Sequence, residues 1–370
     1  MQLDDNISTK RLLGYLVTLL LALCALLASA WIFTGTQRHR FLESGFAVWD
    51  AKQTILRTCK LGNLAVFGDS RIDSAFIPAR MTSTASNLGF AGGTPIENYF
   101  FVQKMLQCDN RPSKVMLSFN PSAFEIVQPW LWDNAVRYGM ISAVQLGQVR
   151  ADSERLADSS YAAVTPKMGM SGLLRDMIYA SHFPAIYFDS LVESRLIGRA
   201  ELNRKKFQQV IDSRGYPAYQ RGAAIPLAAR VNDAATINDG AIFAPLPLQL
   251  SYFEKTLTIL ERAGVDTYFL ITPYSNVGAH AGNARYKAAY LAYLRSLPSR
   301  YTHFHLLQDN VPVWSDAMFA DSAHLNERGA HAFSHQLNGC IESADRSANA
   351  CQFKQIDPTT GTAIVQQAPL

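Results

Sequence analysis

Short apolar runs alternate with helical patterns along much of this chain, and that alternation most constrains its fold. Runs of this length without polar alternation are typical of strands buried on both faces of a parallel sheet. The expected strands are Leu64–Phe67, Val115–Phe119, Val265–Thr272 and Tyr301–Leu307. The expected helices are Phe41–Leu56, Ile96–Leu106, Leu248–Ala263, Ala284–Leu297 and Asn326–Leu337. The sequence therefore predicts an α/β fold with a mostly parallel sheet flanked by helices.

The stretch from 122 to 247 lacks this alternation. It contains Trp130, Trp132 and helical patterns at Ser171–Tyr179 and Ile186–Ile197. We expect a helical insertion over the carboxyl ends of the strands, where ligands of such sheets bind. Aromatic residues at helical spacing pack in a core more often than they bind a ligand, so both interpretations of the tryptophans stay open.

An uncharged segment from Leu12 to Phe33 precedes the fold. It is long enough to cross the roughly 30 Å hydrocarbon core of a bilayer. The alternative is a cleaved signal peptide with Ala28-Ser29-Ala30 as its cleavage site. Because the apolar stretch is longer than a usual signal peptide core and continues past that site, we expect an uncleaved membrane helix. Basic residues lie on both sides of it, so charge does not fix its orientation.

Composition and motif spacing argue against three kinds of partner. The net charge is only +4 over 370 residues, without a basic run, so we expect no nucleic acid. His303 and His305 lie on an expected strand without a third ligand at suitable spacing, so we expect no metal. The glycines between Gly89 and Gly93 lack the Lys-Ser/Thr ending of a phosphate-binding loop, so we expect no nucleotide cofactor.

Two polar motifs lie where strands are expected to end. Gly68-Asp69-Ser70 follows the first strand, and Asp321-Ser322-Ala323-His324 precedes the last helix. A serine hydroxyl becomes a good nucleophile when an imidazole takes its proton, and a carboxylate orients that imidazole. We therefore expect Ser70 as the nucleophile, His324 as the base and Asp321 as its partner, with Asp316 as the weaker alternative carboxylate.

Four segments in order give the chain a resemblance to the SGNH/GDSL hydrolase superfamily. They are Gly68-Asp69-Ser70, Asn87 to Thr94 with Gly92, Ser118-Phe119-Asn120, and Asp321 with His324. The resemblance implies a three-layer, flavodoxin-like fold. It also implies an oxyanion hole made by the main-chain N–H groups of Ser70 and Gly92 and the side-chain amide of Asn120, with Gly89 and Gly93 as alternatives to Gly92.

Two departures point to a narrower group within that superfamily. The third segment continues with Pro121 instead of Asp, and Arg71 follows the serine instead of Leu. Both features are similar to membrane-anchored members that act on cell-envelope polymers, such as the D-alanyl transfer proteins of teichoic acid and polysaccharide O-acetylation proteins. The resemblance implies ester chemistry through an acyl-enzyme on Ser70, as an esterase or an O-acyltransferase.

The same resemblance implies partners for the protein. The substrate would be an acylated polysaccharide or a similar envelope polymer, and a transferase would work with a multipass membrane acyltransferase that supplies the acyl group. The alternative is a non-catalytic glycan-binding or assembly protein with the same fold. The expected division is a tail and membrane anchor at 1–36, a connector at 37–58, an SGNH-like catalytic domain at 59–352 with the insertion at 122–247, and a disordered tail at 353–370.

Cysteine usage bears on the compartment. Four cysteines lie outside the apolar segment, Cys59, Cys108, Cys340 and Cys351, and they allow three pairings. Cys59 and Cys108 each precede an expected strand, and the fold that the motifs resemble makes those strands neighbours. We therefore expect Cys59–Cys108 and Cys340–Cys351 bonds, and a domain outside the cytoplasmic membrane. Four free thiols in a cytosolic domain are the alternative.

Overall fold

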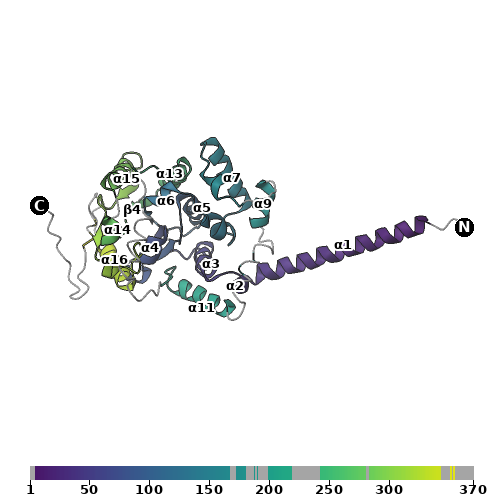
Figure 1. Ribbon diagram of the computed structural model, residues 1–370. Coiled ribbons are helices and arrows are strands. Elements are labelled where there is room, and N and C mark those ends of the chain that lie inside the picture. The colour runs from purple at the N-terminus through teal and green to yellow at the C-terminus, as the bar shows by residue number, and fades with distance from the viewer. Residues whose placement is uncertain are drawn as a thin grey trace.

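The computed structural model describes residues 5–166, 172–180, 187, 190, 199–218, 242–280, 283–342, 351, 353 and 354. Most of the helix predicted at Ile186–Ile197 and the tail predicted to be disordered, from residue 355 on, lie outside the described residues. Figure 1 shows one long N-terminal helix, α1 (Asp5–Thr36), that extends away from a packed body of helices and strands.

Five parallel strands form the central sheet in the order β2-β1-β3-β4-β6. They are β1 (Leu64–Gly68), β2 (Ala85–Gly89), β3 (Lys114–Ser118), β4 (Asp266–Phe269) and β6 (Phe304–Leu306). The predicted α/β fold with a mostly parallel sheet is confirmed. A second, two-stranded sheet pairs β5 (Tyr274–Ser275) with β7 (Val313–Trp314).

Strand β2 was not predicted, because its sequence Ala-Ser-Asn-Leu-Gly contains one large apolar residue. Hydrogen bonds satisfy its buried polar side chains instead. The Ser86 hydroxyl donates to the carbonyl oxygen of Leu61 at 2.7 Å, and the Asn87 amide donates to the carbonyl oxygens of Asp73 and Phe76 at 2.9 and 2.7 Å. A polar edge strand of this kind gives no apolar pattern to read.

Helices cover both faces of the sheet. They include α2 (Arg38–Phe41), α3 (Ser44–Arg57), α4 (Ser70–Ala75), α5 (Pro95–Leu106), α6 (Ser122–Glu125), α7 (Ala143–Arg155), α8 (Ser160–Val164), α9 (Gly172–Ala180), α11 (Arg199–Asp212), α13 (Pro247–Arg262), α14 (Asn276–His280), α15 (Ala284–Ser296) and α16 (Glu327–Glu342). Ala65 and Phe67 of β1 pack in a cluster with α3, α5, α13 and α15. Leu64 and Val66 pack in a second cluster with α4 and α16. Successive strand residues point to opposite faces, so the sheet lies between two helical layers.

The segment expected as a connector belongs to this packed body. Helix α3 contributes Phe46 and Trp49 to the larger core cluster, and Lys52 is fully buried. At the other end, Phe353 is buried and stacks on Phe333 with ring centroids 5.0 Å apart. The packed body therefore reaches from α3 at least to Phe353.

The described part of the insertion contains α6, α7, α8, α9, α11 and the π-helical turn η2 (Leu131–Val136), joined by turns and loops. Its two tryptophans differ in environment. Trp132 is buried and packs edge-on against Tyr179 at 5.4 Å, whereas Trp130 is 48% exposed. The interpretation as core packing therefore fits Trp132 and not Trp130.

Within α1, Thr9–Thr36 is long and apolar enough to span a membrane, and an 18-residue window of it has a mean hydropathy of 2.5 and no buried residue. The bonds Cys59–Cys108 and Cys340–Cys351 are both formed. Strands β1 and β3 are neighbours, with Leu64 opposite Lys114, so the two cysteines meet near the amino ends of these strands. Both predicted disulfides are confirmed.

Candidate active site

Ser70 is the first residue of α4 and stands at the carboxyl end of β1, an interior strand of the sheet. The turn that presents it depends on Gly68, whose φ is +150° and where a Cβ would lie 1.9 Å from the carbonyl oxygen of Ser118. Asp69 then caps α4 by accepting the main-chain N–H of Arg71 at 2.9 Å. A glycine and a capping carboxylate thus fix the direction in which Ser70 points.

His324 links Ser70 to Asp321. Its Nε2 lies 2.8 Å from Ser70 Oγ, and its Nδ1 lies 2.8 and 2.9 Å from the two carboxylate oxygens of Asp321. A carboxylate only accepts hydrogen bonds, so Nδ1 carries the proton and Nε2 is left to accept from the serine hydroxyl. The structure brings together the three residues that the motifs singled out, with the imidazole between the serine hydroxyl and the carboxylate.

The carboxylate of Asp321 is held in its charged form. Burial alone would raise its pKa, but hydrogen bonds from His324 Nδ1 and from the main-chain N–H groups of Ala323 and His324 lower the pKa of Asp321 to about 2. Asp316 is in η4 (Asp316–Met318), where its side chain faces the main-chain N–H of Val277 at 3.4 Å. Asp321, and not the alternative Asp316, is the partner of His324.

Two main-chain donors are available beside Ser70. Among the described residues, no hydrogen bond engages the N–H of Ser70 or of Gly92. The N–H of Gly89 donates to Asn87 Oδ1 at 3.1 Å, and that of Gly93 donates to the carbonyl oxygen of Phe90 at 3.0 Å. The two alternative glycines are therefore occupied, and of the three only Gly92, with a φ of +69°, has an N–H that no hydrogen bond engages in the described part of the chain.

Asn120 follows β3 and is tied to Asp69. Its main-chain N–H and its side-chain Nδ2 both donate to Asp69 Oδ2, at 2.7 and 2.5 Å, and its Oδ1 accepts from the hydroxyl of Ser122. One amide N–H remains for another acceptor, since an NH₂ group carries two. Asn120 is next to the nucleophile turn but does not line the cavity around Ser70.

The cavity around Ser70 has a volume of about 330 Å³. Ser70, Ala91, Gly92, Gln128, Trp130, Ala320, Asp321, His324 and Leu325 line it. It therefore holds Ser70, His324 and the unengaged N–H groups of Ser70 and Gly92 beyond the carboxyl ends of the strands, where ligands of parallel sheets bind.

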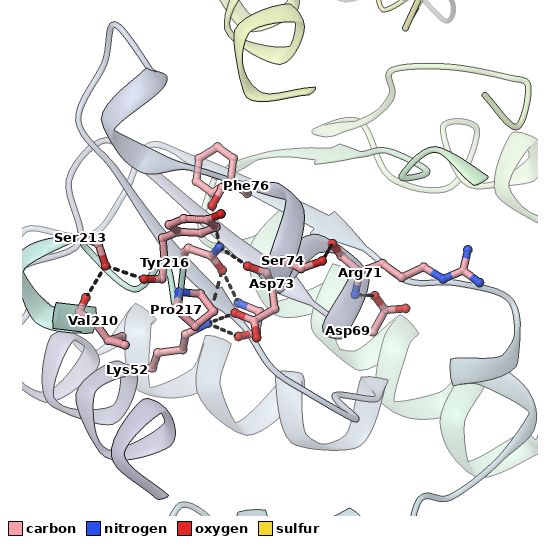
Figure 2. Close-up of polar contacts among 12 residues, drawn as sticks. Lys52, Asp69, Arg71, Asp73, Ser74, Phe76, Val210, Ser213, Tyr216 and Pro217 are labelled. Carbon is pink, nitrogen blue, oxygen red and sulfur yellow. Dashed lines mark hydrogen bonds and ion pairs between the residues drawn. The ribbon is translucent and has the colours of Figure 1, made fainter. Parts of the chain in front are cut away.

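A buried ion pair ties α4, the helix that begins at Ser70, to α3, and the sequence analysis did not predict it. Figure 2 shows Lys52 of α3 pointing at Asp73 of α4. Lys52 Nζ also donates to the carbonyl oxygen of Gly89, and it lies 3.5 Å from Asn87 Oδ1. Burial lowers the pKa of Lys52 and raises that of Asp73. The available signal was one lysine among the apolar positions of the pattern at 41–56.

Arg71 takes no part in the cavity. It is buried, and its guanidinium lies 4.2 Å from the ring centroid of Tyr274. In Figure 2 its side chain extends away from the Lys52–Asp73 pair.

Within the described part of the chain, no group of three His, Cys, Asp or Glu side chains is arranged to hold a metal ion. His303 and His305 both face Asp266, at 3.5 and 3.7 Å.

No protein-family model matches the chain, and no curated protein matches it in sequence.

Proposed function

We propose that the protein is a serine-dependent enzyme of the SGNH/GDSL type that acts on acyl esters of a cell-envelope polysaccharide or a similar polymer. One observation carries this proposal. The hydrogen-bonded series Ser70, His324 and Asp321 opens into the same cavity as the unengaged N–H groups of Ser70 and Gly92. A nucleophile, a base and oxyanion donors in one cavity are what acyl transfer requires.

The reaction follows from these positions. Ser70 Oγ attacks the ester carbonyl carbon while its proton passes to His324 Nε2, and the main-chain N–H groups of Ser70 and Gly92 stabilise the oxyanion. The tetrahedral intermediate then expels the alcohol, which takes the proton from His324, and the acyl group stays on Ser70. In the second half, His324 removes a proton from water or from a sugar hydroxyl, whose oxygen attacks the acyl carbon. The bond to Ser70 Oγ then breaks, Oγ takes the proton back from His324, and the acid or the new sugar ester leaves.

The acceptor decides whether the enzyme is an esterase or an O-acyltransferase. The long apolar helix α1 and the two disulfides support a domain tethered on the outer side of the cytoplasmic membrane. There an envelope polymer is within reach. For a transferase, a multipass membrane acyltransferase would deliver the acyl group from the cytoplasm.

A fluorophosphonate probe tests the proposal, because it reacts only with an activated serine. We expect the full-length protein in detergent to be labelled on Ser70, and Ser70→Ala to lose the label. Ser74→Ala is the matched control, since Ser74 is buried in the same helix and its hydroxyl bonds the carbonyl oxygen of Arg71. A wild-type protein that takes no label at Ser70 would contradict the mechanism.

A further inference from the structure

Trp130 stands at the rim of the cavity that holds Ser70. Nearly half of its surface, 48%, is exposed, although it lines the cavity together with Ser70 and His324. Its side chain also lies against Gly92, where a Cβ would come within 3.0 Å of Trp130 Cγ. The indole is therefore next to the proposed oxyanion donor, with an apolar ring left open to solvent.

The backbone around Trp130 is fixed. The N–H of Leu131 donates to the carbonyl oxygen of Gln128 at 3.0 Å, and the N–H of Trp132 donates to that of Pro129 at 2.9 Å. Leu131 and Trp132, which follow Trp130, are both buried. An aromatic ring on a segment held in this way loses little conformational entropy when it binds a ligand.

The other walls of the cavity limit the kind of ligand. Ala91, Ala320 and Leu325 are small or apolar, and no Lys or Arg is among the described residues that line it. Phosphate groups are bound through charge-assisted hydrogen bonds from such cations. The volume of about 330 Å³ is at the low end for ligand sites, which favours a short acyl group over a long chain.

Gln128 adds a polar group to the same wall. Its amide both donates and accepts hydrogen bonds, as sugar hydroxyls do. A pyranose ring has C–H groups on its flat faces and hydroxyls at its edge. The C–H groups suit the electron-rich face of an indole, and the hydroxyls suit the amide.

We infer that Trp130 and Gln128 form a sugar subsite, and that the ester processed at Ser70 is a short acyl group on a pyranose ring without a phosphate. The ring rests on Trp130 while the acyl group enters between Ala91, Ala320 and Leu325. This inference rests on the proposed acyl chemistry at Ser70 and adds the class of sugar that carries the ester.

Two acetate esters, one of a pyranose and one of a simple alcohol, separate the subsite from the chemistry when each rate is divided by its rate of hydrolysis in hydroxide alone. The probes are a singly O-acetylated methyl glucopyranoside and ethyl acetate, with acid release followed in a pH-stat on the full-length protein in detergent. We expect the wild type to show a kcat/KM for the glycoside about tenfold or more above that for ethyl acetate.

Substitutions at Trp130 then identify the contact. Trp130→Ala and Trp130→Leu should remove most of that preference, mainly through KM for the glycoside, while Trp130→Phe should keep most of it because a flat ring remains. Gln128→Ala should reduce it in the same way. Val144→Ala, an exposed apolar residue on α7 that does not line the cavity, is the matched control and should keep the wild-type preference.

Three outcomes would overturn the subsite while leaving the acyl chemistry in place. The first is that the wild type hydrolyses both esters with no preference. The second is that Trp130→Ala lowers kcat/KM equally for both esters. The third is that Trp130→Leu behaves like the wild type, which would make Trp130 a contact for the acyl chain. If the wild type hydrolyses neither ester and takes no fluorophosphonate at Ser70, the proposed function itself fails.

Discussion

His324 Nε2 lies 2.8 Å from Ser70 Oγ, although 254 positions separate the two residues. A second contact holds α4, which begins at Ser70, against α16, which follows His324. The hydroxyl of Ser334, on α16, donates to the carbonyl oxygen of Ala75 at 3.0 Å and accepts the N–H of Ile77 at 2.9 Å. Because Ala75 ends α4 and Ser70 begins it, the helix after His324 is fixed on the helix that carries the nucleophile.

Substitution of the triad should give unequal losses. Ser70→Ala or His324→Ala should lower kcat by about 10⁶, and Asp321→Asn by about 10⁴, because the imidazole then keeps its place and loses orientation and charge support. Steady-state ester hydrolysis measures these losses, with circular dichroism as a check on folding. Full turnover in Ser70→Ala would rule out an acyl-enzyme on this serine.

Asn120→Ala should lower kcat by about 10²–10³ with a smaller change in KM, if the free amide N–H serves the transition state. Ser122→Ala is the control, since it removes only the hydroxyl that bonds Asn120 Oδ1. An unchanged kcat with a raised KM would make Asn120 a substrate-binding residue. No change in either would limit Asn120 to its hydrogen bonds with Asp69.

The parts that sequence predicted are those with a local signal. Val115–Phe119 predicts a strand because a short run of consecutive apolar residues is typical of a strand buried on both faces. It matches β3 (Lys114–Ser118) closely. The positions of Ser70 and His324 follow from the same signal, since both motifs lie where an element ends. Their meeting could be expected only from the family resemblance, because no spacing along the chain encodes it.

The parts that sequence missed depend on long-range contacts. Lys52 falls among the apolar positions of its helix, but only the fold places Asp73 against it. Strand β2 is polar and is held by the Asn87 amide. The exposure of Trp130 and the burial of Trp132, two positions apart in one aromatic segment, are likewise set by packing and not by composition.

Glu97 should make stability depend on pH. Its carboxylate accepts the N–H of Thr94 at 2.9 Å, and burial raises the pKa of Glu97 from 4.5 to about 7. Between about pH 4.5 and 7, this carboxyl group is therefore protonated in the folded state and ionised in the unfolded chain. The free energy of unfolding falls as pH rises through this window, by on the order of 3 kcal/mol.

Glu97→Gln should remove that slope, because the amide oxygen can still accept from Thr94 and does not ionise. Urea unfolding at a series of pH values measures it. Glu154→Gln, at an exposed position on α7, should leave the wild-type slope in place. A slope that is unchanged in Glu97→Gln would assign it to other groups.

The disulfides should be closed in protein taken from its native membrane. Under denaturing but non-reducing conditions, an alkylating reagent should modify one of the 5 cysteines, the free Cys24, and after reduction it should modify all of them. The Cys59–Cys108 bond spans 49 positions and the Cys340–Cys351 bond spans 11, so loss of the first should destabilise more, by about 4 against about 3 kcal/mol. Five reactive thiols before reduction would place the domain in the cytoplasm, and the envelope substrate would be wrong.

The Lys52–Asp73 pair should hold the nucleophile helix on α3. Lys52→Met keeps the length of the side chain but leaves Asp73 without its cation and Gly89 without a donor. We expect a loss of about 3–5 kcal/mol in the free energy of unfolding, which is the usual cost of breaking a buried pair from one side. The double variant Lys52→Met with Asp73→Asn should lose less than the sum of the two single variants, because no charge is then left unpaired.

Lys60→Met, at an exposed lysine just after α3, is the control and should change the free energy of unfolding by less than about 0.5 kcal/mol. Denaturant unfolding of the wild type and the four variants decides the matter: a Lys52→Met midpoint equal to that of the wild type would show that this buried pair contributes nothing to the stability of the fold around Ser70.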